Sequence, residues 1–180
     1  MAETLERVYA SALFELCCEN DCLSEIYDEM GQVNDIFSGN EEFVKLLSSP
    51  LINDTDKHSI LDKTFNGKIS DLFFDFICVL SDKGRANAFS GIYDEFRNMY
   101  NDKMNILEVN VTTTEKMSDG IREKLIEKLS SVTGKSVLLD EKIDKSLLGG
   151  IIVRYDNVEI DSSVKGKLDK LKKQIDSTIA

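Results

Sequence analysis

The 180-residue sequence contains little of what metal, phosphate or nucleophilic chemistry requires. It has one histidine, His58, and no serine or cysteine stands beside it in the pattern of a catalytic nucleophile. Its four cysteines fit no metal-binding spacing. Gly134, Lys135 and Ser136 look like the end of a phosphate-binding loop, but Leu129 stands where that loop requires its first glycine. We therefore expect no catalytic residue, no metal and no cofactor, with His58 on the surface and four reduced cysteines: Cys17, Cys18, Cys22 and Cys78.

Long hydrophobic runs are also missing. The longest, Phe76 to Leu80, is far shorter than the ~20 residues that a membrane-spanning helix needs. The acidic N-terminus lacks the shape of a signal peptide. The sequence therefore predicts a cytoplasmic protein without direct membrane insertion, and its acidity argues against a nucleic-acid partner.

Charge and aromatic content divide the chain near residue 105. Residues 1–105 carry 20 acidic and 9 basic side chains, whereas residues 106–180 carry 13 of each, so the first part holds the whole net charge of −11. All nine phenylalanines and all four cysteines also lie in the first part. This distribution predicts two domains, 1–105 and 106–180, each with its own core. No proline- or glycine-rich linker marks the joint, so we expect residues 101–105 to form a short connection after a helix.

Apolar residues recur at helical spacing throughout the first part, which predicts a compact bundle of six helices. Pro50 ends the third helix, and Ser70 is placed to cap the fifth. The fifth helix carries apolar side chains on more than one face, so it is either central to the bundle or partly reserved for a partner. The expected helices cover residues 5–16, 23–37, 43–47, 54–65, 72–80 and 89–100.

The second part predicts a small mixed domain. A strand from Ile106 is followed by a helix beginning at Thr114 and by a second strand, 136–139. Two glycines then precede an aliphatic strand, a turn at 155–158 and a return strand, which together predict a β-hairpin. Asp161 is placed to cap a last helix with an apolar face formed by Val164, Leu168, Leu171 and Ile175. The predicted fold class is α+β, an N-terminal six-helix bundle followed by a small mixed α/β C-terminal domain with a β-hairpin.

The segment from Lys142 to Leu168 resembles the C-terminal signature of the delta subunit family of the rotary F-type ATP synthase, whose mitochondrial member confers oligomycin sensitivity. The opening stretch 7–14 and the Gly84-Arg85 pair resemble other parts of the same family. One departure is Ser162, which stands where many relatives place a glycine. The residues that match the family signature are Gly84, Arg85, Asp144, Gly149, Gly150, Arg154, Asp161 and Gly166.

The resemblance implies a non-catalytic stator subunit of a proton- or sodium-translocating synthase, peripheral to the cytoplasmic face of the bacterial cell membrane. It implies that domain 1–105 binds the catalytic head, by receiving the N-terminal helix of an alpha subunit in a groove between the first and fifth helices. The residues assigned to this groove are Tyr9, Ala12, Leu13, Leu16, Phe76, Val79 and Leu80. Because groove and core require the same residue types, the sequence leaves open which of them line the groove.

The resemblance also implies that domain 106–180 binds the b-subunit coiled coil of the peripheral stalk. Lys165, Lys167 and Lys170 are the residues assigned to that contact, and a solvated helix face is the alternative reading of the same lysines. The alternative for the whole chain is an acidic helical adaptor or regulatory protein unrelated to ATP synthase.

Overall fold

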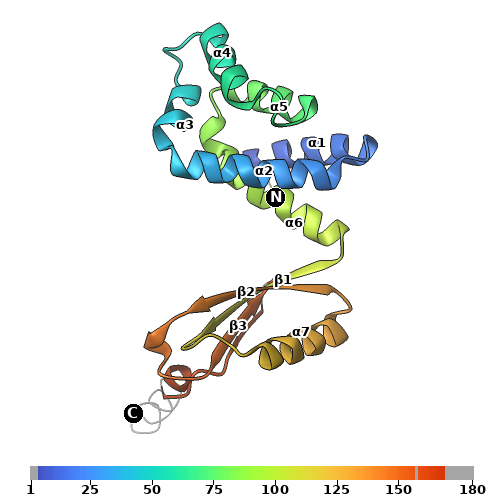
Figure 1. Ribbon diagram of the computed structural model, residues 1–180, viewed down its shortest axis with the longest axis vertical. Helices are drawn as coiled ribbons and strands as arrows, with labels where there is room; N and C mark the ends of the chain where they lie inside the picture. The colour runs from blue at the N-terminus through green and yellow to red at the C-terminus, as the bar shows by residue number, and fades with distance from the viewer. Residues whose placement is uncertain (1–3, 157, 169–180) are drawn as a thin grey trace. The chain divides into compact units, whose positions relative to one another are not determined.

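The computed structural model describes residues 4–156 and 158–168, and within them the chain has the mixed α+β architecture that the sequence predicted (Figure 1). The chain divides into two compact units between Tyr100 and Asn101. The boundary expected from composition lay slightly later, between residues 105 and 106. The first unit is helical, and the second contains the sheet.

Two helices of the first unit begin at residues whose side chains cap them. Thr4 accepts a hydrogen bond from the backbone N–H of Arg7 (3.4 Å), and Asn53 accepts one from Asp56 (2.8 Å), each satisfying a donor that the first helical turn leaves free. The elements are α1 (Leu5–Glu19), α2 (Leu23–Gly39), α3 (Glu41–Ser48), α4 (Asp54–Phe65), α5 (Asp71–Asp82), the short 3-10 helix η1 (Ala86–Ala88) and α6 (Phe89–Lys103).

An aromatic cluster fills the core of the first unit. Phe37 lies 5.0 Å from Phe89 between ring centroids, and Phe73 lies 6.2 Å from Phe89, so α2, α5 and α6 meet around these rings. Phe96 is also fully buried and receives the edge of Phe14 from α1. These contacts account for the concentration of phenylalanine in this part of the sequence.

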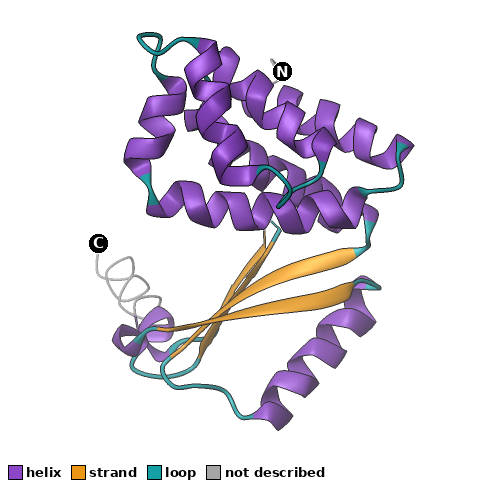
Figure 2. Cartoon of the chain, turned by 45° about the horizontal axis from the view of Figure 1, so that its top comes forward, coloured by secondary structure: helices purple, strands orange, loops and turns teal. Residues whose placement is uncertain are grey.

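The second unit contains a mixed four-stranded sheet, drawn in orange in Figure 2. Its strand order is β2-β1-β3-β4. β1 pairs in parallel with β2 and antiparallel with β3, and β3 pairs antiparallel with β4. Residues 107, 109 and 111 of β1 are buried, while Asn110 is exposed, because the apolar side chains of α7 pack on one face of the sheet. The bounds are β1 (Ile106–Thr113), α7 (Asp119–Thr133), β2 (Ser136–Ile143), the short 3-10 helix η2 (Lys145–Leu147), β3 (Ile151–Tyr155) and β4 (Val158–Asp161).

Several boundaries differ from the sequence prediction; the second strand, for example, continues to Ile143 where an end at residue 139 was expected. The connection expected at 101–105 is shorter, because α6 continues to Lys103; Asn105 then turns the chain with a φ of 56°. The helix expected from Thr114 begins only at Asp119. Before it, Thr113 Oγ1 donates to the carbonyl of Glu115 (2.8 Å), which holds this stretch in a non-helical conformation.

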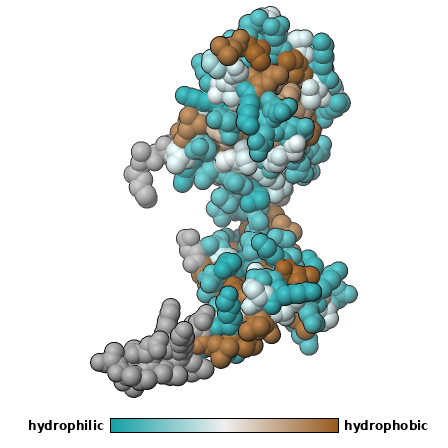
Figure 3. Space-filling model, turned by 90° about the vertical axis from the view of Figure 1, so that its left-hand side faces the viewer, coloured by the Kyte–Doolittle hydropathy of each residue, from teal (hydrophilic) through white to brown (hydrophobic). Residues whose placement is uncertain are grey.

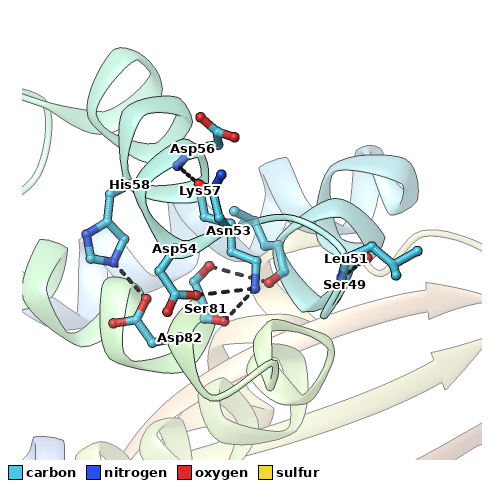
Figure 4. A network of polar contacts seen from close by, with 10 residues as sticks. Ser49, Leu51, Asn53, Asp54, Asp56, Lys57, His58, Ser81 and Asp82 are labelled. Carbon is cyan, nitrogen blue, oxygen red and sulfur yellow. Dashed lines mark hydrogen bonds and ion pairs between the residues drawn. The ribbon is translucent and has the colours of Figure 1, made fainter.

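A buried lysine joins α4 to the end of α5 (Figure 4). Lys57 is only 3% exposed, and its Nζ donates to the carbonyl oxygen of Ser81 (3.3 Å) and lies 3.9 Å from an Asp54 carboxylate oxygen. A positive charge at the C-terminal end of α5 interacts favourably with the helix dipole. His58, predicted to lie on the surface, is part-exposed and contacts Asp82 through Nε2 at 2.7 Å. α4 therefore fixes the end of α5 through two adjacent side chains.

We predict that Lys57→Ala destabilises the first unit by about 1–3 kcal/mol, since it removes a buried stem together with a hydrogen bond. The matched control is Lys45→Ala, because Lys45 pairs with Glu41 on the solvated surface and exposed pairs contribute less than about 1 kcal/mol. Calorimetric unfolding of the full chain measures both. Equal unfolding temperatures for the two variants would contradict the structural role given to Lys57.

Candidate functional site

A groove of about 390 Å³ runs between α1 and α5. Its walls carry apolar side chains at steps of three and one along each helix, the spacing that places residues on one helical face. The lining residues are Tyr9, Ala12, Leu13 and Leu16 from α1, and Leu72, Asp75, Phe76 and Val79 from α5.

The structure brings together all but one of the residues that the sequence assigned to this groove. Leu80 does not line it, because its side chain is 1% exposed and belongs to the core. Leu13 is equally buried and lines the groove from the core side, whereas Leu16 and Val79 are each 47% exposed. α5 therefore contributes side chains both to the core and to the groove.

Two lining residues were missed by the sequence analysis. Leu72 and Asp75 precede Phe76 and Val79 at steps of three and one, so the signal for them was the continuation of the same helical face toward the start of α5. Asp75 in particular is not apolar and was therefore not selected.

Arg85 holds one wall residue of the groove. Its Nη1 donates to the hydroxyl of Tyr9 (2.8 Å), and its guanidinium carbon lies 5.6 Å from the centroid of the Tyr9 ring. Tyr9 in turn meets Phe76 edge to face at 6.3 Å. Gly84 adopts a φ of 63°, a left-handed conformation that favours glycine, immediately before Arg85. The Gly84-Arg85 pair thus links the end of α5 to α1 at the groove.

The start of α5 is fixed by a carboxylate from α2. Ser70 occupies the N-cap position but makes no side-chain cap, contrary to the sequence prediction. Its backbone N–H and its hydroxyl both donate instead to the carboxylate of Glu29, at 2.7 and 2.8 Å. Charge-assisted bonds of this kind are stronger than neutral ones, and they place a negative charge at a helix N-terminus.

The groove is suited to binding an amphipathic helix. An apolar channel between two helices is the surface that receives an amphipathic helix. Within residues 4–156 and 158–168, no group of three or more histidine, cysteine or acidic side chains could hold a metal ion. Burial, with the neighbouring Cys22 thiol, raises the pKa of Cys17 to about 12, so this thiol stays protonated near neutral pH.

In the second unit, the signature residues form a packed corner where β3 begins. Asp144 accepts a hydrogen bond from the backbone N–H of Ser146 (2.9 Å), which caps η2. Hydrogen bonding from the Ser146 side chain, and then from this N–H, lowers the pKa of Asp144. Leu148 and Gly150 follow with φ angles of 61° and 84°. The N–H of Val164 then donates to the carbonyl of Gly149 (2.9 Å), which ties this turn to the segment after β4.

Two signature glycines lie at close contacts in this corner, and the backbone contact at Gly150 requires glycine there. A Cβ on Gly150 would lie 2.5 Å from the carbonyl oxygen of Ser162, and one on Gly166 would lie 2.7 Å from the carboxyl carbon of Asp161. Ser162 does not have a positive φ, so the serine that departs from the family pattern fits here without backbone strain. Arg154 pairs with Glu159 across the hairpin at 2.6 Å. These signature residues build the fold of the corner.

The last described turn carries the lysines assigned to the stalk. Lys165 and Lys167 are exposed, whereas Lys170, Leu171 and Ile175 lie outside the described residues. The helix is capped by Ser163, whose hydroxyl accepts from the N–H of Gly166 (2.9 Å). Asp161, the predicted cap, instead accepts from the N–H of Ser163 (2.8 Å).

The second unit also exposes apolar side chains, two of which, Val164 and Leu168, lie in the same turn as these lysines. Leu148, Val158, Ile160, Val164 and Leu168 are each more than two-fifths exposed, and Val164 lies against Gly149 at the corner. Apolar surface of the second unit is visible in Figure 3 on the face drawn. The last described turn thus exposes both basic and apolar side chains.

Comparison with known proteins gives a consistent result over nearly the whole chain. Residues 5–175 match the family described as ATP synthase delta (OSCP) subunit. ATP synthase subunit delta of Clostridium kluyveri is 34% identical over 173 residues, which cover 96% of both chains. That of Fusobacterium nucleatum is 35% identical, with 93% of this chain and 95% of the relative covered. A chain of the mitochondrial ATP synthase hexamer of Toxoplasma gondii shares the fold, with a TM-score of 0.77 at 24% identity over 96% of this chain and 98% of that one.

We predict that Gly150→Ala destabilises the second unit by about 2 kcal/mol or more, because alanine adds both an unfavourable φ and a clash with Ser162. Gly120→Ala is the control, since Gly120 lies in α7 with nothing within 4 Å of the added Cβ, and a helical alanine should leave stability unchanged or raised. Urea unfolding of the full chain measures the stability of each variant, and amide hydrogen exchange measures the protection of β3. Parent-like protection of β3 in Gly150→Ala would refute the packing argument.

Proposed function

The chain belongs to the ATP synthase delta (OSCP) subunit family, and we propose that it is the stator subunit that joins the catalytic head of a proton- or sodium-translocating F-type synthase to its peripheral stalk. It is a structural subunit and not an enzyme. The family match spans both units, which disfavours an acidic adaptor unrelated to the synthase.

The first attachment in this proposal is the groove between α1 and α5, which receives the N-terminal helix of an alpha subunit. The observation that carries it is the exposure of Leu16 and Val79 on facing walls above buried Leu13. Covering such side chains contributes roughly 25 cal/mol per Å² of apolar surface removed from water. A helix with apolar residues at steps of three and four would fill the channel.

The second attachment is the corner of the second unit, which binds the b-subunit coiled coil. Lys165 and Lys167 supply positive charge beside Val164 and Leu168. Basic side chains at the edge of an apolar patch suit a coiled-coil helix, whose flanking positions often carry glutamate.

Two attachment points in one chain give the proposed mechanism. Once one unit has bound, the other is held close to its own partner, so its effective concentration rises without any new contact. The head is thereby kept from turning with the rotor.

No helix in the described part of the chain is long and apolar enough to cross a membrane. We place the protein at the cytoplasmic face of the bacterial cell membrane, as a peripheral subunit of the synthase.

The groove assignment predicts that Val79→Asp weakens binding of the alpha-subunit N-terminal peptide on the order of a hundredfold, because the new carboxylate would be desolvated without a partner. Binding to the b subunit should be unchanged. Leu51→Asp is the control, since Leu51 is 94% exposed and does not line the groove. Isothermal titration on folded variants measures the effect. A folded Val79→Asp protein with parent-like affinity would exclude the groove.

The stalk assignment predicts that the double variant Lys165→Glu, Lys167→Glu weakens b-subunit binding at least several-fold, because reversed charges would face the coiled coil. Alpha-peptide binding should remain. The control reverses Lys124 and Lys128, two exposed lysines of α7. Equal b-subunit affinities for the two double variants would leave the corner without a role in stalk binding.

A further inference from the structure

One charged side chain, Asp75, is among the eight residues that line the groove. It is exposed, and within residues 4–156 and 158–168 no lysine, arginine or histidine lies within ion-pair distance of its carboxylate. Its neighbours in the lining are Leu72, Phe76 and Val79. A partner helix that covers these apolar neighbours would also remove water from the carboxylate.

The helices that form the groove carry few positive charges. From Asp71 to Asp82 every ionised side chain of α5 is acidic, and after Arg7 the charges of α1 are acidic as well. Burial raises the pKa of Cys78 to about 11, and the carboxylates of Asp82, Asp75 and Asp62 add to this effect.

The basic residues near the ends of α5 are partly engaged elsewhere. Lys68 donates to the carbonyl of Thr64 (2.8 Å), and Arg85 donates to the hydroxyl of Tyr9. Lys83 occupies the C-cap position of α5, beyond Val79. None of them lies within 4 Å of Asp75 among the described residues.

We propose that Asp75 selects the groove's occupant by charge: the alpha-subunit N-terminal helix presents a lysine or arginine beside its apolar stripe, and this cation pairs with Asp75. The inference rests on the groove function proposed above and adds the chemistry of the partner. A helix with apolar residues alone would cover an unpaired carboxylate, which is costly, whereas a basic residue both removes that cost and accelerates encounter with the acidic surface.

The test compares four full-length proteins: the parent, Asp75→Asn, Asp75→Glu and Asp71→Asn. The probe is a synthetic peptide of the alpha-subunit N-terminal segment from the same organism, together with a version in which every lysine and arginine is glutamine. Surface plasmon resonance gives affinities and association rates at low salt and at ~0.5 M salt. At the higher salt, exposed charges interact over only a few ångströms. Circular dichroism verifies the fold of each variant.

We expect Asp75→Asn to bind the native peptide about three- to fivefold more weakly at low salt, mainly through a slower association, with the difference lost at high salt. Asp75→Glu keeps the charge and should bind like the parent, as should Asp71→Asn, which lies outside the groove lining. The glutamine peptide should no longer distinguish the parent from Asp75→Asn.

Parent-like binding by Asp75→Asn, a native peptide without lysine or arginine, or loss of helical structure in Asp75→Asn would each overturn the selection by charge. The groove itself is judged separately by Val79→Asp. If Val79→Asp still weakens binding while Asp75→Asn does not, the proposed function stands and only this inference fails. If neither variant weakens binding, the proposed groove function and the selection by charge both fail.

Discussion

The contact between α1 and α5 is the constraint on which the binding surface depends. These helices are far apart in sequence, and their separation sets the width of the groove. Tyr9 bridges them through the ring of Phe76 and the guanidinium of Arg85. Both ends of α5 are fixed from other helices, by Glu29 at its start and by Lys57 at its end. The groove is therefore a preformed feature of the bundle, and preformed sites lose less entropy when a partner binds.

The second unit is organised by a different constraint, the close approach of backbone segments at the corner before β3. Gly150 and Gly166 allow Ser162 and Asp161 to lie where a Cβ would otherwise stand. The family signature in this region thus consists of residues that permit close backbone packing. It brings the last described turn, with Lys165, against the hairpin, so the same residues that fold the corner also place the surface proposed for the stalk.

Sequence periodicity was sufficient for the fold class, because helical faces follow from spacing, whereas the pairing of the first and fifth helices into a groove came from the resemblance to the delta subunit family. Periodicity could not separate Leu80 from Leu16, since burial depends on how neighbouring helices pack. Asp75 was missed because an apolar pattern does not select a charged residue. The polar bridges of Glu29 and Lys57 were not predicted either, because they join residues 41 and 24 positions apart. The helix start at Asp119 was displaced by the Thr113 hydrogen bond, a local competition that periodicity does not register.

The central claim is that one chain holds two partners at the same time through separate surfaces. Size-exclusion chromatography with light scattering tests it directly on three purified components: the catalytic head without this subunit, the soluble part of the b-subunit stalk, and the full chain. We predict no association of head and stalk alone and a ternary complex when the chain is added. Two binary complexes without a ternary one, with head and stalk competing for the chain, would contradict the account.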